Sequence, residues 1–141
     1  MFQIDAFTSK RFEGNPAAVV VMDADIDESV MQLIAAENNL SETAFVNISS
    51  EPFYIRWFAP SAEVDLCGHA TLASAKALFD NYFQEKNEIV FTCKEHGKLL
   101  AKRDDGLIYL DFPTDNPAKY ERVEKIRDAT VSYTHLTLPT T

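Results

Sequence analysis

The stretch that decides the fold is residues 68–83, which read GHATLASAKALFDNYF. Small and apolar side chains fill the first three turns of this segment, and Lys76 is the one charged residue there. A helix that is apolar nearly all round lies in the interior of a protein. Its alanines would also let neighbouring strands approach closely. We therefore predict a central buried helix with a sheet wrapped around it.

Short segments on both sides of this helix have the apolar patterns of strands. The expected strands are residues 2–7, 17–22, 43–46 and 53–58 before it, and 89–92, 98–103 and 107–112 after it. Asp105-Gly106 is a strong type I′ hairpin pair, and Pro113 ends the last strand because it cannot donate to the ladder. The predicted class is α+β, with an antiparallel or mixed sheet around one central helix.

A second helix is expected to begin at Glu28, after Asp27 as its N-cap. Val30, Leu33 and Ile34 are expected to form its buried face, and Asn38-Asn39 is expected to end it.

Composition narrows the class of protein. The chain has 141 residues, which is enough for one domain, and its net charge of −9 disfavours nucleic-acid binding. Two cysteines do not make a disulfide framework, so we expect both thiols to be reduced and the protein to be cytoplasmic. No membrane span, secretory signal, P-loop, GxGxxG or GxSxG motif is present in the sequence.

Glu42 is the first candidate for chemistry. Side chains alternate along a strand, so Glu42 would share a face with Ala44 and Val46. If that face is the core face, the carboxylate stands at the edge of an apolar pocket, where desolvation suits it to general acid/base work near neutral pH. The alternative is an exposed glutamate at the end of a strand.

The second candidate is the beginning of the buried helix. Gly68 offers no side-chain cap, so the first amides could bind a substrate carboxylate, helped by the helix dipole and by His69. Cys67 lies beside the same helix terminus, which would lower the pKa of its thiol and let it abstract a proton. The alternatives are a terminus capped by water or a loop, and a small buried cysteine. The Cys-x-His spacing of Cys67 and His69 has no second ligand pair beside it, so no metal is expected.

Several motifs together are similar to the PhzF (phenazine-biosynthesis) family. They cover residues 1–113 in order and without a gap: DAFT at 5–8, GNPA at 14–17, AAENNLSETAF at 35–45, RWF at 56–58, VDLCGHATLA at 64–73 and LDFP at 110–113. The two longest of these motifs are highly specific.

The resemblance implies a fold like that of diaminopimelate epimerase, in which two similar domains each wrap a sheet around a helix. It implies cofactor-independent isomerisation in the cleft between the domains, with Glu42 moving the proton. It also implies that His69, Asn15 and the amides of Gly68 and Ala70 contact a small carboxylated substrate.

The chain departs from this family in length. Family members are roughly twice as long, so we expect an N-terminal domain at residues 1–125 without its second domain. Residues 126–141 resemble a translated cloning or sequencing scar, and an interdomain linker is the alternative. We expect the piece alone to be inactive and to associate into aggregates or a homodimer, because its cleft surface would be open.

Three functions stay open at this point. The first is proton-shuttling isomerisation by Glu42, without metal or cofactor. The second is a racemase or epimerase that uses Cys67, as the related epimerases carry a catalytic cysteine in a similar Cys-Gly turn. The third is a non-catalytic binding protein or fragment that keeps the fold.

Overall fold

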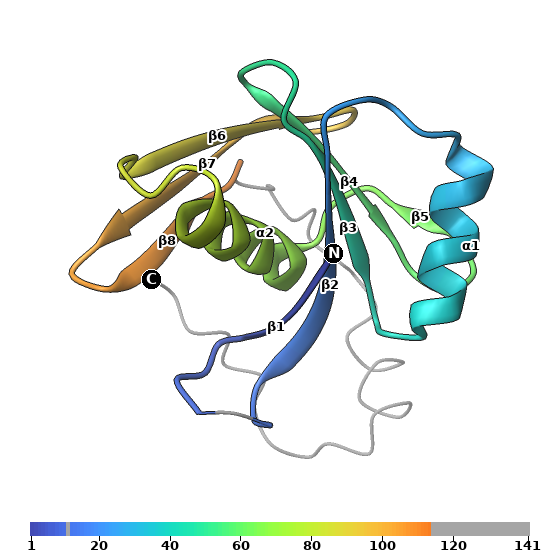
Figure 1. Cartoon of the computed structure of the whole chain (residues 1–141), viewed down its shortest axis with the longest axis horizontal. Coiled ribbons are helices and arrows are strands. Elements are labelled where there is room, and N and C mark those ends of the chain that lie inside the picture. Colours follow the sequence, from blue (N-terminus) through green and yellow to red (C-terminus); the bar gives the residue numbers. More distant parts are fainter. Residues whose placement is uncertain (11, 114–141) are drawn as a thin grey trace, which may run out of the picture.

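The computed structural model describes residues 1–10 and 12–113. The segment expected to be a tail or linker, residues 126–141, lies outside this part. One sheet and two helices make up the described chain (Figure 1). No helix of this part is long and apolar enough to span a membrane.

Seven strands of the mixed sheet follow one another in the order β1-β2-β3-β4-β6-β7-β8, and the short β5 pairs with β4. The pairs β2–β3 and β4–β6 are parallel and the others are antiparallel. The strands are β1 (Phe2–Ala6), β2 (Asn15–Met22), β3 (Thr43–Asn47), β4 (Phe53–Phe58), β5 (Glu63–Val64), β6 (Glu88–Cys93), β7 (Gly97–Asp104) and β8 (Leu107–Asp111). Every strand expected from the sequence is present, and β5 is an addition.

The central helix is α2 (Gly68–Asn81), and the sheet curls around it (Figure 1). Eight of its residues are buried, including the polar Thr71 and Ser74. These two hydroxyls donate to the carbonyl oxygens of Cys67 and Ala70, at 2.6 and 2.7 Å. Their burial therefore leaves no unsatisfied hydroxyl, and the prediction of a buried helix inside a wrapped sheet is confirmed.

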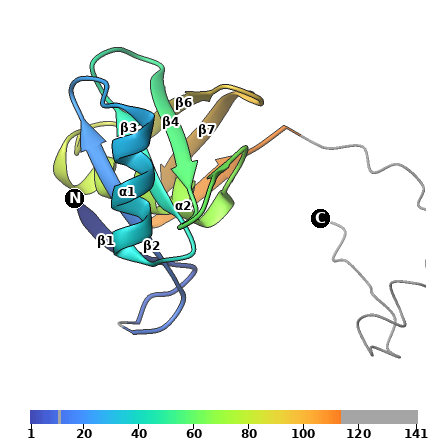
Figure 2. The same ribbon diagram turned by 90° about the vertical axis from the view of Figure 1, so that its right-hand side faces the viewer.

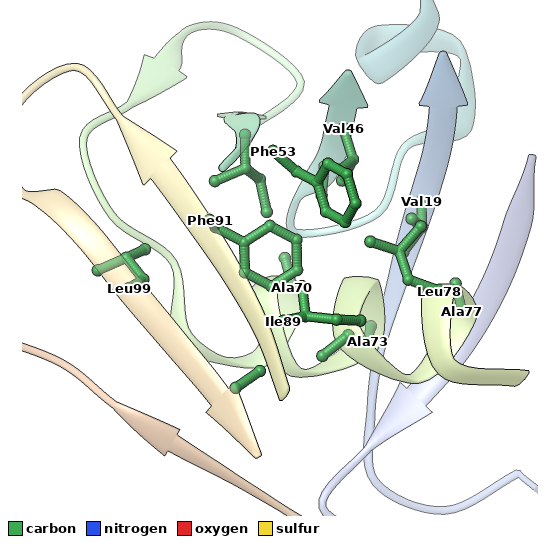
Figure 3. Packing of buried hydrophobic residues seen from close by; sticks show 14 of the residues in the cluster. Val19, Val46, Phe53, Ala70, Ala73, Ala77, Leu78, Ile89, Phe91 and Leu99 are labelled. Carbon is green, nitrogen blue, oxygen red and sulfur yellow. The ribbon is translucent and has the colours of Figure 1, made fainter. Parts of the chain in front are cut away.

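The core between α2 and the sheet is built from alternate strand residues. Val19 and Val46 meet the alanine face of α2, where Ala70, Ala73 and Ala77 leave room for large side chains such as Phe53 and Phe91 (Figure 3). Small side chains on the helix and large ones on the strands interdigitate, as close packing requires.

Helix α1 (Glu28–Asn38) covers the opposite face of the sheet (Figures 1 and 2). The prediction of its buried face was wrong. Met31 and Ala35 are buried against Phe45 and Phe58, whereas Val30 is 43% exposed and Leu33 is 69% exposed. Apolar residues occupy both possible faces of this helix, and the small Ala35 lets the helix lie close to the aromatic rings.

The ends of α1 agree only partly with the sequence. Asn39 follows the helix in the left-handed conformation at φ 51°, as expected for an asparagine that ends a helix. Asp27 holds the N-cap position, but its side chain makes no capping hydrogen bond. Asp27 therefore marks the beginning of α1 through its backbone conformation alone.

The β7–β8 hairpin turns at Asp105 and Gly106, both with positive φ (45° and 76°), as a type I′ turn requires. A second special turn precedes β2. Gly14 has φ 93°, and a Cβ atom there would lie 2.4 Å from the carbonyl oxygen of Ala6. Only glycine fits this position, which brings Asn15 into β2.

Candidate active site

Glu42 lies directly before β3, at the end of the strand that is near the beginning of α2. Its backbone carbonyl accepts a hydrogen bond from the amide of Ala18 at 3.3 Å, which holds it against β2. Ala44 and Val46, two and four residues further on, belong to the core around α2. The Glu42 side chain is 22% exposed, so it stands at the edge of that core as the alternation predicted.

His69 joins Glu42 from the first turn of α2. Its Nε2 atom lies 3.4 Å from Oε2 of Glu42 and 3.3 Å from Oγ of Ser41, and its side chain is 10% exposed. The ring therefore presents one nitrogen to the carboxylate and the neighbouring hydroxyl. Two predicted site residues that are 27 positions apart in sequence are thus in contact.

Cys67 holds the other side of the ring. Its Sγ atom lies 3.3 Å from Nδ1 of His69. Burial raises the pKa of the Cys67 thiol to about 11, and the backbone N–H groups of Ala70 and His69 offset this effect only in part. Glu42 raises the pKa further through its negative charge and a hydrogen bond. The expected lowering of this pKa by the helix terminus is wrong, because desolvation outweighs the amides.

The beginning of α2 has no side-chain cap, and its first turn contains no acidic residue. A Cβ atom at Gly68 would lie 3.6 Å from the ring of Phe112, an ordinary contact, so packing within the described residues does not demand glycine there. Ala70 is fully buried and its amide lies beside the Cys67 sulfur. A role of Gly68 and Ala70 in holding a substrate anion stays a prediction.

Asn15 lies at the same edge of the sheet. Because β2 and β3 are parallel with Ala18 opposite Thr43, the first residue of β2 lies near the beginning of β3. Asn15 alternates with Ala17 and Val19, which face α2, and it is exposed. The structure thus places all the predicted site residues at one edge, beside the beginning of α2.

Sequence reasoning did not select Ser41, although it is next to Glu42. Its hydroxyl is within hydrogen-bonding distance of His69. The helix–strand connection that carries Glu42 could have indicated it, since a short loop residue beside a candidate base shares its surroundings.

Three donor atoms in this site could approach a metal ion. One donor atom each from Glu42, Cys67 and His69 lies within 4.8 Å of the others. The sequence spacing did not indicate Glu42 as a third donor. However, an ion bonds a single ring nitrogen, whereas here Nδ1 faces the sulfur and Nε2 faces the carboxylate. Together with a thiol pKa of about 11, this arrangement favours a chain of hydrogen bonds over metal ligation.

Comparison with known proteins matches this architecture to one family. A family model described as phenazine biosynthesis-like protein matches residues 4–139. The chain is 46% identical to an uncharacterized isomerase of Pseudomonas aeruginosa, over 90% of this chain and 48% of the relative. It is 42% identical to the human phenazine biosynthesis-like domain-containing protein, over 89% of this chain and 47% of the relative. The chain therefore belongs to the phenazine biosynthesis-like family.

Solved structures agree with this assignment. A PhzF family protein of Enterococcus faecalis aligns with a TM-score of 0.80 and 43% identity, over 91% of this chain and 49% of that chain. A predicted epimerase of Pseudomonas aeruginosa aligns with a TM-score of 0.63 and 26% identity, over 77% of this chain and 40% of that chain. The expected epimerase-like fold is confirmed. The chain spans about half the length of the relatives it matches.

Proposed function

We propose that this chain carries the proton-transfer residue of a cofactor-independent isomerase that acts on a small carboxylated substrate. The observation that carries the proposal is the contact of Glu42 Oε2 with His69 Nε2 at 3.4 Å, at the partly open edge of a buried core. Relatives of similar sequence are named isomerases, which supports the reaction class.

The proposed chemistry needs one base that becomes an acid. The Glu42 carboxylate takes a proton from one carbon of the substrate, the electron pair of that C–H bond shifts along the substrate, and Glu42 returns the proton to another carbon. His69 holds Glu42 in place and meets the polar groups of the substrate. Amides at the beginning of α2 favour the substrate's negative charge.

Replacing Glu42 tests this proposal. In the full-length protein, Glu42→Gln keeps the shape of the side chain and removes the group that takes the proton. We expect incorporation of deuterium from D2O into the substrate to fall by at least about 100-fold, the usual contribution of an acid/base residue. Folding should be retained by circular dichroism.

The matched control is Glu37→Gln, the same change on an exposed residue of α1, which should leave exchange unchanged. Full exchange in Glu42→Gln would remove Glu42 from the mechanism.

A second candidate function is a cysteine-based racemase or epimerase. The aligned epimerase structure and the position of Cys67 beside His69 favour it, whereas the raised pKa of the thiol opposes it. Loss of activity in Cys67→Ala together with retained activity in Glu42→Gln would support this second candidate. If the full-length protein exchanges no proton with any carboxylated substrate, a non-catalytic binding role would replace both.

A further inference from the structure

Both ring nitrogens of His69 have partners, and the two partners differ in chemistry. Nδ1 lies 3.3 Å from the Cys67 sulfur, and Nε2 lies 3.4 Å from a Glu42 carboxylate oxygen. A neutral imidazole has one nitrogen that donates and one that accepts, and its neighbours decide which is which. The surroundings of the ring therefore specify a tautomer.

We propose that Cys67 is a positioning residue whose thiol donates a hydrogen bond to Nδ1 of His69 and thereby places the ring proton on Nε2, facing Glu42. This inference rests on the proposed function, because it gives Glu42 a fixed N–H partner for its acid/base work.

The direction of the thiol hydrogen bond follows from what surrounds the sulfur. The backbone N–H groups of His69 and Ala70 point toward it and occupy its role as an acceptor. The thiol's own hydrogen then remains to be donated, and Nδ1 is a ring acceptor within reach. Cys67 is buried, which favours the protonated thiol.

The opposite tautomer would place two acceptors face to face. With the ring proton on Nδ1, the lone pair of Nε2 would point at a carboxylate oxygen 3.4 Å away. With the proton on Nε2, His69 donates toward Glu42 and holds one carboxylate oxygen. The other oxygen is then free to meet a substrate, and a misplaced carboxylate is costly for proton transfer.

Other charged groups on the neighbouring elements do not compete for the ring. Lys76, further along α2, is paired with Asp80. Arg56 of β4 binds Glu28 and Glu63 on the opposite face of the sheet. On β1 and β8 the carboxylates alternate with the residues that face α2, so they fall on the outer face. Cys67 and Glu42 are therefore the titratable groups that meet His69 directly.

The tautomer can be measured without turnover by long-range 1H–15N NMR of the imidazole, at a pH where the ring is neutral. His69→Gln assigns the signals, because the affected ring disappears from the spectrum. In the unmodified chain we expect a bare Nδ1 and a protonated Nε2. A ring proton on Nδ1 would overturn the inference without any mutation of Cys67.

Glu42 also favours the proton on Nε2, so its effect must be separated from that of Cys67. In a Glu42→Gln background we expect the Nε2–H tautomer to persist. Adding Cys67→Ala should lower the ratio of Nε2–H to Nδ1–H by about fivefold, the effect of losing one net hydrogen bond. Cys67→Ser supplies another donor in the same place and should restore the ratio.

An unchanged ratio in Glu42→Gln/Cys67→Ala would overturn the inference. If that variant does not fold, the tautomer in Glu42→Gln alone still decides, since a ring proton on Nδ1 there would show that the thiol does not donate. These readouts are independent of activity. A failure of the proposed isomerase function would therefore show in deuterium exchange and leave the tautomer as it is.

Discussion

At the scale of single residues, alternation along β3 predicted the position of Glu42, and burial reversed the prediction for Cys67. Alternation is a property of the backbone, so two buried neighbours in sequence are enough to place the carboxylate. The pKa of a thiol depends on how completely the fold removes water from it. The sequence places Cys67 at a helix terminus but does not show the walls that β8 and β3 build around it.

The reactivity of Cys67 tests this reversal. With a pKa of about 11, only roughly one thiol in a thousand is ionised at pH 8, against about one in four for an ordinary cysteine. Because the thiolate is the nucleophile, we expect alkylation of Cys67 by iodoacetamide to be slow at pH 8. Its rate should rise about tenfold per pH unit up to roughly pH 10, measured by mass spectrometry in Cys93→Ser.

Unfolding provides the internal control, since labelling in denaturant should follow an ordinary cysteine. Rapid labelling of the folded chain at pH 7 would show a lowered pKa and would favour the cysteine-based mechanism.

At the scale of elements, the sequence predicted what local patterns determine and failed where two packings satisfy the same pattern. The alanine-rich α2, the strands and the Asp105-Gly106 turn have local causes in their residues. Helix α1 carries apolar residues on two faces, and only the ring of Phe45 in the partner sheet decides which one is buried. The parallel pairing of β2 with β3 also depends on non-local contacts, and it is this pairing that brings Asn15 toward Glu42.

The turn before β2 gives a prediction at this scale. Gly14→Ala should lower the free energy of unfolding by roughly 2–4 kcal/mol, since it combines an unfavourable φ with a clash against the backbone at Ala6. Gly106→Ala is the matched control. Its φ is also positive, but no atom lies within 4 Å of an added Cβ, so we expect a cost of about 1 kcal/mol.

Urea unfolding of both variants measures the difference. Equal costs would mean that the β1–β2 loop moves aside without penalty and that the close approach at Gly14 is unimportant for stability.

At the scale of the whole molecule, the sheet has two edges, and the one formed by β8 is apolar. Residues 107–110 of this strand carry no charge, and Leu107 and Tyr109 are 59% and 53% exposed. A cavity of about 590 Å³ lies beside it, between the β1–β2 loop, α2 and the β7–β8 turn. Exposed uncharged edge strands pair readily with other chains. The net charge of −9 opposes indiscriminate aggregation, so association should concentrate at this edge.

We therefore expect the 141-residue chain to self-associate and, by itself, to catalyse no isomerisation. Sedimentation velocity at several concentrations should show a sedimentation coefficient that rises with concentration, and more steeply at high salt, which screens the repulsion between copies. Tyr109→Lys places a charge on the β8 edge and should shift association to higher concentration. Leu33→Lys, a comparable change on exposed α1, should have little effect. The lack of turnover has a separate cause: the Glu42–His69 edge is open to water in this chain, and acid/base transfer needs an enclosed, oriented substrate. A monomer at every concentration that nevertheless exchanges substrate protons with D2O would contradict both expectations, and would show that one domain of this family suffices for catalysis.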